Sequence, residues 1–155
     1  MKRNFEFTYE ELPYEELLPE EKRMVELAVN TSQTKAYAPY SHFSVAAVAL
    51  LENGEMVCGT NQENASYPCG VCAERVALSA AAVQYDCAVH RLAIAARTPD
   101  GKLLGEPITP CGMCRQVILE TEKRYDHSIS ILLCAANKYY RIEKASQLLP
   151  FQFDL

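Results

Sequence analysis

The sequence predicts a single α/β domain in which helices cover both faces of a mixed sheet of about five strands, a three-layer α/β/α arrangement. The chain has 155 residues and is 49% hydrophobic, which suits one compact core. Short apolar runs alternate along it with longer segments of helical periodicity. The short runs are apolar at nearly every position, so both faces of the sheet should be buried under helices.

The N-terminal part divides into an arm and a first helix. Residues 1–18 are acidic and aromatic and are predicted to be an irregular arm outside the domain, which should span residues 19–155. A helix should begin at Pro19, because a proline followed by two acidic residues is typical of a first helical turn. Pro39 should end it.

A hairpin should follow the first helix. Residues 45–51 form a continuous apolar run that predicts a buried strand, and Asn53-Gly54 is a strong signal for a tight turn. Residues 56–58 should return as the second strand. The remaining elements are expected to be a buried alanine-rich helix, a strand, a helix, two strands and a short helix, over residues 73–83, 92–96, 111–124, 129–135, 139–142 and 145–149.

Composition excludes several classes of function. The net charge is −5 and no cluster of Lys or Arg occurs, which argues against a nucleic-acid partner. No apolar run approaches the ~20 residues of a membrane span, and the N-terminus lacks the apolar stretch of a secretory signal. Four of the seven cysteines stand in C-x-x-C pairs, so a metal site in a cytoplasmic protein is expected rather than disulfides.

The two C-x-x-C pairs predict the metal centre. Thiolates at this spacing favour tetrahedral zinc, and Cys72, Cys111 and Cys114 should lie at helix N-termini, where thiol pKa values fall. Three ligands would leave one position for water, with Glu74 beside it as a proton carrier. The alternative is a closed four-thiolate site that includes Cys69. A closed site has no use for Glu74, and the 38 residues between the pairs are unlike a compact zinc ribbon.

Arg75 is expected to hydrogen-bond the ligand sulfurs and to withdraw the excess negative charge of three thiolates. Arg75 could instead be an ordinary surface residue of the helix. Glu74 could likewise be an ordinary first-turn glutamate that the helix dipole favours. His42, His90 and His127 do not occupy ligand positions and are interpreted as structural or surface residues.

Cys-Ala-Glu-Arg at residues 72–75 and Pro-Cys-Gly-Met-Cys-Arg-Gln at residues 110–116 resemble the small, tetrameric type of cytidine deaminase. The resemblance runs from about Glu21 to the C-terminus. It implies one Zn²⁺ per chain on the three cysteines named above, with Glu74 as the catalytic proton carrier. The implied reaction converts cytidine and 2′-deoxycytidine to uridine and 2′-deoxyuridine with release of ammonia, in pyrimidine salvage.

The same resemblance assigns the substrate contacts. Asn61 and Glu63 would hold the ribose 3′-hydroxyl, although taken alone their segment could be a polar loop that caps the next helix. A site built around a hydroxyl rejects substrates that lack one. Three further contacts are implied, namely Phe43 packed on the pyrimidine, the backbone N–H of Ala73 on the carbonyl O2, and Tyr67 as a binding residue.

At the C-terminus, the family's tail carries an aromatic residue into the site of a neighbouring subunit. Phe153 is the better match to it and Phe151 the second choice, so a homotetramer with sites near subunit interfaces is implied. The chain departs from the family at Ser44 and Ala46, where Pro and Gly are usual, and Ala46 is expected to tighten the pocket floor.

Three other functions compete with this interpretation. The nearest is a deaminase of another aminopyrimidine, such as blasticidin or free cytosine, which the Asn61 and Glu63 pair disfavours. A non-catalytic zinc module for partner binding and an enzyme that edits nucleic acids are the others. The acidic balance of the chain disfavours the last.

Overall fold

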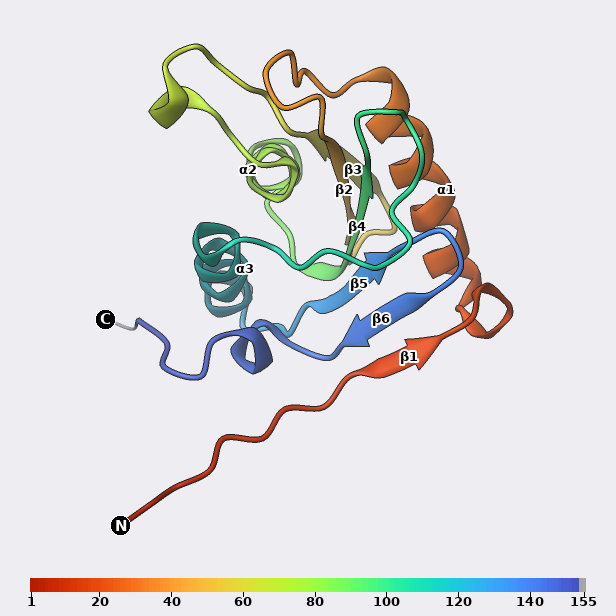
Figure 1. The fold of residues 1–155 in the computed structure, drawn as a ribbon. Helices are drawn as coiled ribbons and strands as arrows, with labels where there is room; N and C mark the ends of the chain where they lie inside the picture. Colours follow the sequence, from red (N-terminus) through yellow and green to blue (C-terminus); the bar gives the residue numbers. More distant parts are fainter. Residues whose placement is uncertain (154–155) are drawn as a thin grey trace.

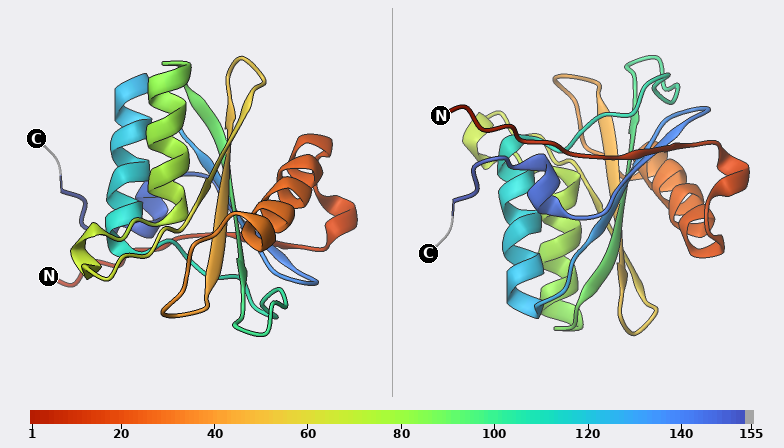
Figure 2. Two further views of the ribbon diagram at one scale, coloured as in Figure 1. Left: turned by 90° about the horizontal axis from the view of Figure 1, so that it is seen from above. Right: turned by 90° about the horizontal axis from the view of Figure 1, so that it is seen from below.

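A computed structural model describes residues 1–153 and arranges them in three layers (Figure 1). Helices α2 and α3 lie side by side on one face of the sheet, and α1 covers the other face (Figure 2). The helices and strands, in chain order, are β1 (Glu10–Leu12), α1 (Pro19–Thr34), β2 (Ser44–Leu51), β3 (Met56–Thr60), α2 (Ala73–Gln84), β4 (Val89–Arg97), α3 (Gly112–Tyr125), β5 (Ser130–Cys134) and β6 (Tyr139–Ile142). The predicted fold class is confirmed.

Among residues 1–153, the sheet has six strands in the order β1-β6-β5-β4-β2-β3, one more than predicted. Of the described strands, only β4 and β5 run parallel, and α3 connects them. The additional strand is β1, which pairs antiparallel with β6 and sets Glu11 opposite Tyr140. The prediction of an irregular arm is therefore wrong at Glu10–Leu12. Glutamate is uncommon in strands, so the local sequence did not indicate β1, which forms because it pairs with β6. The division into residues 1–18 and 19–155 stays a prediction.

Two helices differ from the sequence-based expectation, one in where it ends and one in its type. Helix α1 begins at Pro19 as predicted, where the Glu21 carboxylate accepts a hydrogen bond from the Leu18 N–H at 2.9 Å. It ends at Thr34, five residues before Pro39. The last helix is a single 3₁₀ turn at Ala145–Leu148 instead of an α-helix, a common form for so short a segment.

Alternate residues of the central strands point into two separate cores. Ala47, Ala49 and Leu51 of β2 pack under α2 and α3, whereas Val48 and Leu50 pack under α1. This two-sided burial explains why the strands read as continuous apolar runs. No helix of residues 1–153 is both long and apolar enough to cross a membrane.

A buried carboxylate fastens α1 to the sheet. Glu21 is 1% exposed and lies within 3.2 Å of Arg91 on β4 and 2.6 Å of Arg141 on β6. Arg141 also pairs with Glu10 of β1 at 2.7 Å. Burial acts to raise the pKa of Glu21, but hydrogen bonds from Arg141 and from the Leu18 N–H hold it below its usual value. One ion-pair network, centred on Glu21 and Arg141, therefore joins α1, β1, β4 and β6.

The first turn of α2 lies directly against β3. A Cβ placed on Gly59 would stand 2.3 Å from the Ala73 carbonyl oxygen and 2.3 Å from the Ala77 nitrogen. Both are backbone atoms that cannot rotate away. Only glycine allows this approach, so Gly59 sets the distance between the sheet and the N-terminus of α2.

We expect Gly59→Ala to lower the free energy of unfolding by about 3 kcal/mol, because the added methyl group must push α2 off the sheet. Urea unfolding followed by circular dichroism measures the change. Gly105→Ala is the matched control, since nothing lies within 4 Å of a Cβ at Gly105. Equal midpoints for the two variants would show that α2 can shift at little cost.

Candidate metal centre and substrate cavity

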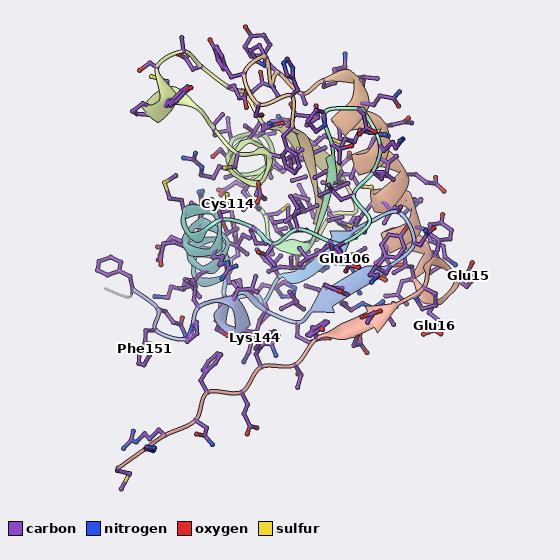
Figure 3. All side chains as sticks on the ribbon, in the orientation of Figure 1. Glu15, Glu16, Glu106, Cys114, Lys144 and Phe151 are labelled. Carbon is purple, nitrogen blue, oxygen red and sulfur yellow. The ribbon has the colours of Figure 1, made fainter. Side chains whose placement is uncertain are left out.

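Two helix N-termini bring the three predicted ligands together. Cys72 is the N-cap of α2 and Cys111 is the N-cap of α3, both with extended backbone. Cys114 follows in the first turn of α3 and is fully buried between the two helices (Figure 3). The sequence prediction that these cysteines stand at helix starts is confirmed.

The sulfur atoms are spaced for a tetrahedral metal. Cys72 Sγ lies 3.8 Å from Cys111 Sγ, which lies 3.4 Å from Cys114 Sγ. All three fall within 4.8 Å of one another, the one such cluster of potential ligands among residues 1–153. Zn–S bonds of about 2.3 Å in a tetrahedron separate sulfurs by about 3.8 Å. Cys69 is exposed and is not part of the cluster, and neither are the histidines.

The chemistry of the donors also suits a divalent cation. Burial raises the pKa of Cys72 and of Cys114, and the nearby Glu74 charge adds to both effects. Burial acts in the same direction on Cys111, but hydrogen bonds from Cys114 and Cys72 lower its pKa. Three thiols packed this closely cannot all ionise without a compensating positive charge. A bound cation would supply it.

Glu74 lies in the first turn of α2, two residues beyond Cys72, and is 5% exposed. Burial raises the pKa of its carboxyl group above the ordinary value. The residue nevertheless lines the cavity described below, so its carboxylate can reach a bound molecule. A proton-transferring residue needs this combination of access and a raised pKa.

Arg75 hydrogen-bonds the loop before α2, and its predicted role beside the sulfurs stays a prediction. Its Nη2 donates to the Gly70 carbonyl oxygen at 3.2 Å, and no described hydrogen bond joins it to a sulfur. Its Nε is buried and has no hydrogen-bond partner among residues 1–153. Arg75 thus ties the loop before α2 to the helix and keeps one buried donor unused.

A cavity of about 590 Å³ opens over the sulfur atoms. The predicted site residues that line it are Phe43, Asn61, Glu63, Tyr67, Cys72, Ala73, Glu74, Arg75 and Cys111. Ile108, Thr109 and Met113 line it as well and were not predicted. Ile108 and Thr109 precede the second cysteine motif and Met113 lies within it, so nearness to Cys111 was the signal available for them. Tyr67 is 78% exposed at the mouth, where its ring meets Tyr40 edge-on at 6.3 Å.

Ala46 does not line the cavity, although the sequence analysis expected it to tighten the cavity floor. Ala46 is fully buried inside the sheet, in register with Thr60 on β3 and Ala95 on β4. Val45, the residue before it, lines the cavity instead, because successive strand residues point to opposite faces.

Opposite the sulfurs, two polar residues connect separate loops. Asn61 Oδ1 accepts from the Val45 N–H at 2.8 Å, and Asn61 Nδ2 donates to the Phe43 carbonyl oxygen at 2.8 Å. Glu63 accepts from the Tyr40 N–H at 2.9 Å and from the Ser41 hydroxyl at 2.5 Å. These hydrogen bonds, the one from Ser41 first, hold the pKa of Glu63 below its usual value.

Ser41 is a site residue that the sequence analysis missed. Its hydroxyl donates to Glu63 and accepts from the Phe43 N–H at 3.0 Å, so one oxygen orients both residues. The available signal was the serine two residues before Phe43, a spacing at which serine often bonds a backbone N–H.

The C-terminal segment lies outside the cavity of its own chain. Gln116 Nε2 donates to the Phe153 carbonyl oxygen at 3.2 Å, which holds this segment along α3. Phe153 is 66% exposed and Phe151 is 98% exposed. Figure 3 shows Phe151 on the segment that leads away from Cys114. Neither aromatic ring takes part in the cavity within a single chain.

Comparisons with known proteins agree on one family. Residues 19–126 match the family model of the cytidine and deoxycytidylate deaminase zinc-binding region. A cytidine deaminase of Mycobacterium tuberculosis is 36% identical over 131 residues, which cover 77% of this chain and 80% of that protein. One from Halalkalibacterium halodurans is 44% identical over 85 residues, 55% of this chain and 60% of that protein. The crystal structure of a cytidine deaminase from Burkholderia pseudomallei superposes with a TM-score of 0.72 at 35% identity, covering 84% of this chain and 97% of that one.

Substitution of single cysteines tests the ligand set. We expect Cys69→Ser to keep the full zinc content of the wild type, because the Cys69 side chain lies outside the sulfur cluster. Cys72→Ser should lose most of it, since two thiolates remain. Metal content per chain, by inductively coupled plasma mass spectrometry, measures both. Loss of zinc in Cys69→Ser would establish the four-thiolate alternative.

Proposed function

The chain belongs to the cytidine and deoxycytidylate deaminase family, and we propose that it hydrolyses cytidine and 2′-deoxycytidine to uridine and 2′-deoxyuridine with release of ammonia. The observation that carries this proposal is the cluster of three cysteines, of which Cys72 and Cys111 line a cavity that the buried Glu74 also lines. A purely structural zinc site would not need an enclosed acid or an open cavity above the metal.

The proposed metal is one Zn²⁺ per chain, held by Cys72, Cys111 and Cys114. When bound, zinc acidifies a water molecule and so supplies the nucleophile at neutral pH. The three thiolates carry more negative charge than Zn²⁺ neutralises. Arg75 is proposed to offset this excess, since it lines the same cavity as Cys72 and has an unused buried Nε donor.

Glu74 is the proposed proton carrier. It takes a proton from the attacking water and delivers it to the ring N3, while the new C–O bond forms at C4. It then transfers the second proton of that water to the leaving amine, and ammonia departs as the C–N bond breaks. The backbone N–H of Ala73, in the first turn of α2, is proposed to bind the carbonyl O2 of the base.

The other end of the cavity is proposed to hold the nucleoside. Asn61 and Glu63 are oriented by backbone groups of the segment at 40–45, so their remaining lone pairs and donors can meet the ribose 3′-hydroxyl. Phe43 lines the same cavity and offers a ring face to the pyrimidine. Tyr67 is proposed to cover the mouth.

A homotetramer is proposed as the assembled form. Phe153 and Phe151 are exposed in the single chain and lie outside its cavity, which suits an aromatic residue that completes the site of a neighbouring copy. Phe153 is the proposed contact. The cytoplasmic location stays a prediction from the sequence.

The proposed function is tested by the ultraviolet absorbance change with cytidine, 2′-deoxycytidine, cytosine and blasticidin S, with zinc measured on the same sample. We expect turnover of both nucleosides, no turnover of the free base and one zinc per chain, because the polar end of the cavity addresses a ribose. Full zinc without turnover of any of the four compounds would identify a non-catalytic zinc module instead.

Glu74→Gln tests the proton-carrying role of Glu74 independently of metal binding. We expect kcat to fall by at least about 10³-fold, since the amide cannot accept and release a proton, while zinc content is retained. Steady-state kinetics and metal analysis of the same preparation measure the two effects. Near-normal kcat in this variant would remove Glu74 from the mechanism.

Ser41→Ala tests how Glu63 is oriented. We expect KM for cytidine to rise about fivefold with little change in kcat, because loss of the Ser41 hydroxyl releases the carboxylate that is proposed to bind the ribose. With 3′-deoxycytidine the variant and the wild type should differ little. Ser79→Ala, on the exposed side of α2, is the control. A loss confined to kcat would assign Ser41 to the chemical step and contradict this role.

A further inference from the structure

The N-terminal arm, residues 1–9, carries an alternating aromatic face. Phe5, Phe7 and Tyr9 stand on one side of the extended chain, at the spacing of successive inward residues in a strand. They line a groove of about 500 Å³ on the α3 side of the sheet, where Tyr140 and Ile142 of β6 form part of its wall. The Tyr9 ring packs on Tyr140 with centroids 4.9 Å apart, and Phe7 stacks on Tyr9 at 6.0 Å.

The contact with its own chain covers only part of this face. Phe5, Phe7 and Tyr9 remain 52%, 51% and 48% exposed. Figure 1 shows the arm leaving the sheet at β1 and continuing past the rest of the chain to the N-terminus. Strand β1 is the last strand at its edge of the sheet, so its outer N–H and C=O groups are free to pair with another strand.

The arm is complementary to a reversed copy of itself. Its odd-numbered residues, in order, are one cation, three aromatic residues and one anion, at positions Arg3, Phe5, Phe7, Tyr9 and Glu11. An antiparallel pair of arms centred on Phe7 would set Arg3 opposite Glu11 and Phe5 opposite Tyr9. Opposite charges and aromatic pairs at directly opposed positions stabilise antiparallel strands.

We propose that the arms of two copies of this chain pair antiparallel along β1, with residues 3–11 of each in register about Phe7. The two sheets then continue into each other across a twofold axis. An isologous contact requires one surface to match itself, and the order of charges along this arm meets that requirement. A different protein as partner would have no need of such symmetry. The proposal does not depend on deaminase activity.

Disulfide trapping tests the pairing directly. At the twofold axis the two residues 7 face each other, within the Cα separation of ~4.4–6.8 Å that a disulfide needs. Phe7→Cys should therefore give a covalent dimer under mild oxidation on a non-reducing gel, well above the wild-type background from native cysteines. In the control Asn4→Cys, position 4 faces Glu10 of the other copy, and the two introduced thiols are about 20 Å apart. No excess dimer for Phe7→Cys over Asn4→Cys would overturn the proposal.

Charge exchange tests the register. In the Phe7→Cys background, Arg3→Glu or Glu11→Arg alone sets like charges opposite each other and should lower the dimer yield about two- to fivefold. The double variant Arg3→Glu/Glu11→Arg should restore it. Lys2→Glu changes the net charge by the same amount as Arg3→Glu. Because residue 2 would face Leu12 of the other copy, this variant should leave the dimer yield unchanged. Equal loss in Lys2→Glu and Arg3→Glu, or no recovery in the double variant, would refute this pairing. Deamination of cytidine by the same samples reports separately on the proposed function.

Discussion

The backbone contact between β3 and the first turn of α2 is the constraint from which the site follows. Because Gly59 has no side chain, the Ala73 carbonyl and the Ala77 nitrogen can lie directly on the strand. The N-terminus of α2, with Cys72 as its cap and Glu74 in its first turn, is thereby fixed against the sheet. Helix α3 packs beside α2 and adds the two other sulfurs. A displacement of α2 by one methyl group would change the sulfur–sulfur distances by more than a metal site tolerates.

The site concentrates groups that are costly to bury. Three thiols and a carboxylate lie at the ends of two helices, and burial raises the pKa of Cys72, Cys114 and Glu74. The positive end of the helix dipole at each N-terminus acts against this cost for Cys72 and Cys111, the two N-cap residues. A divalent cation held by the three cysteines would offset most of the remainder for the thiolates. Glu74 keeps a raised pKa beside them, which suits a group that must both accept and release a proton.

The arm at residues 1–9 and the segment at residues 150–153 lie on the same side of the molecule (Figure 2), and each carries aromatic residues that the single chain leaves exposed. The C-terminal segment is held along α3 by Gln116. The N-terminal arm is held at β1, where Arg141 links Glu10 to the buried Glu21 of α1. The ion-pair network therefore has two roles, since it fastens α1 to the sheet and also fixes the direction in which the arm leaves it.

Most helices and strands, and the cysteines of the candidate metal centre, could be predicted from the sequence. Apolar runs and helical periodicity predicted the central strands and helices, and the two cysteine motifs predicted the three cysteines that the structure brings together, because each signal lies within a few residues of the chain. Tertiary structure alone decided the rest. The pairing of β1 with β6, the clearance at Gly59, the bridge made by Ser41 and the contact of Arg75 with Gly70 depend on how segments pack. Most of these contacts join residues far apart in the chain, and no local preference encodes which backbone groups will then lie in reach.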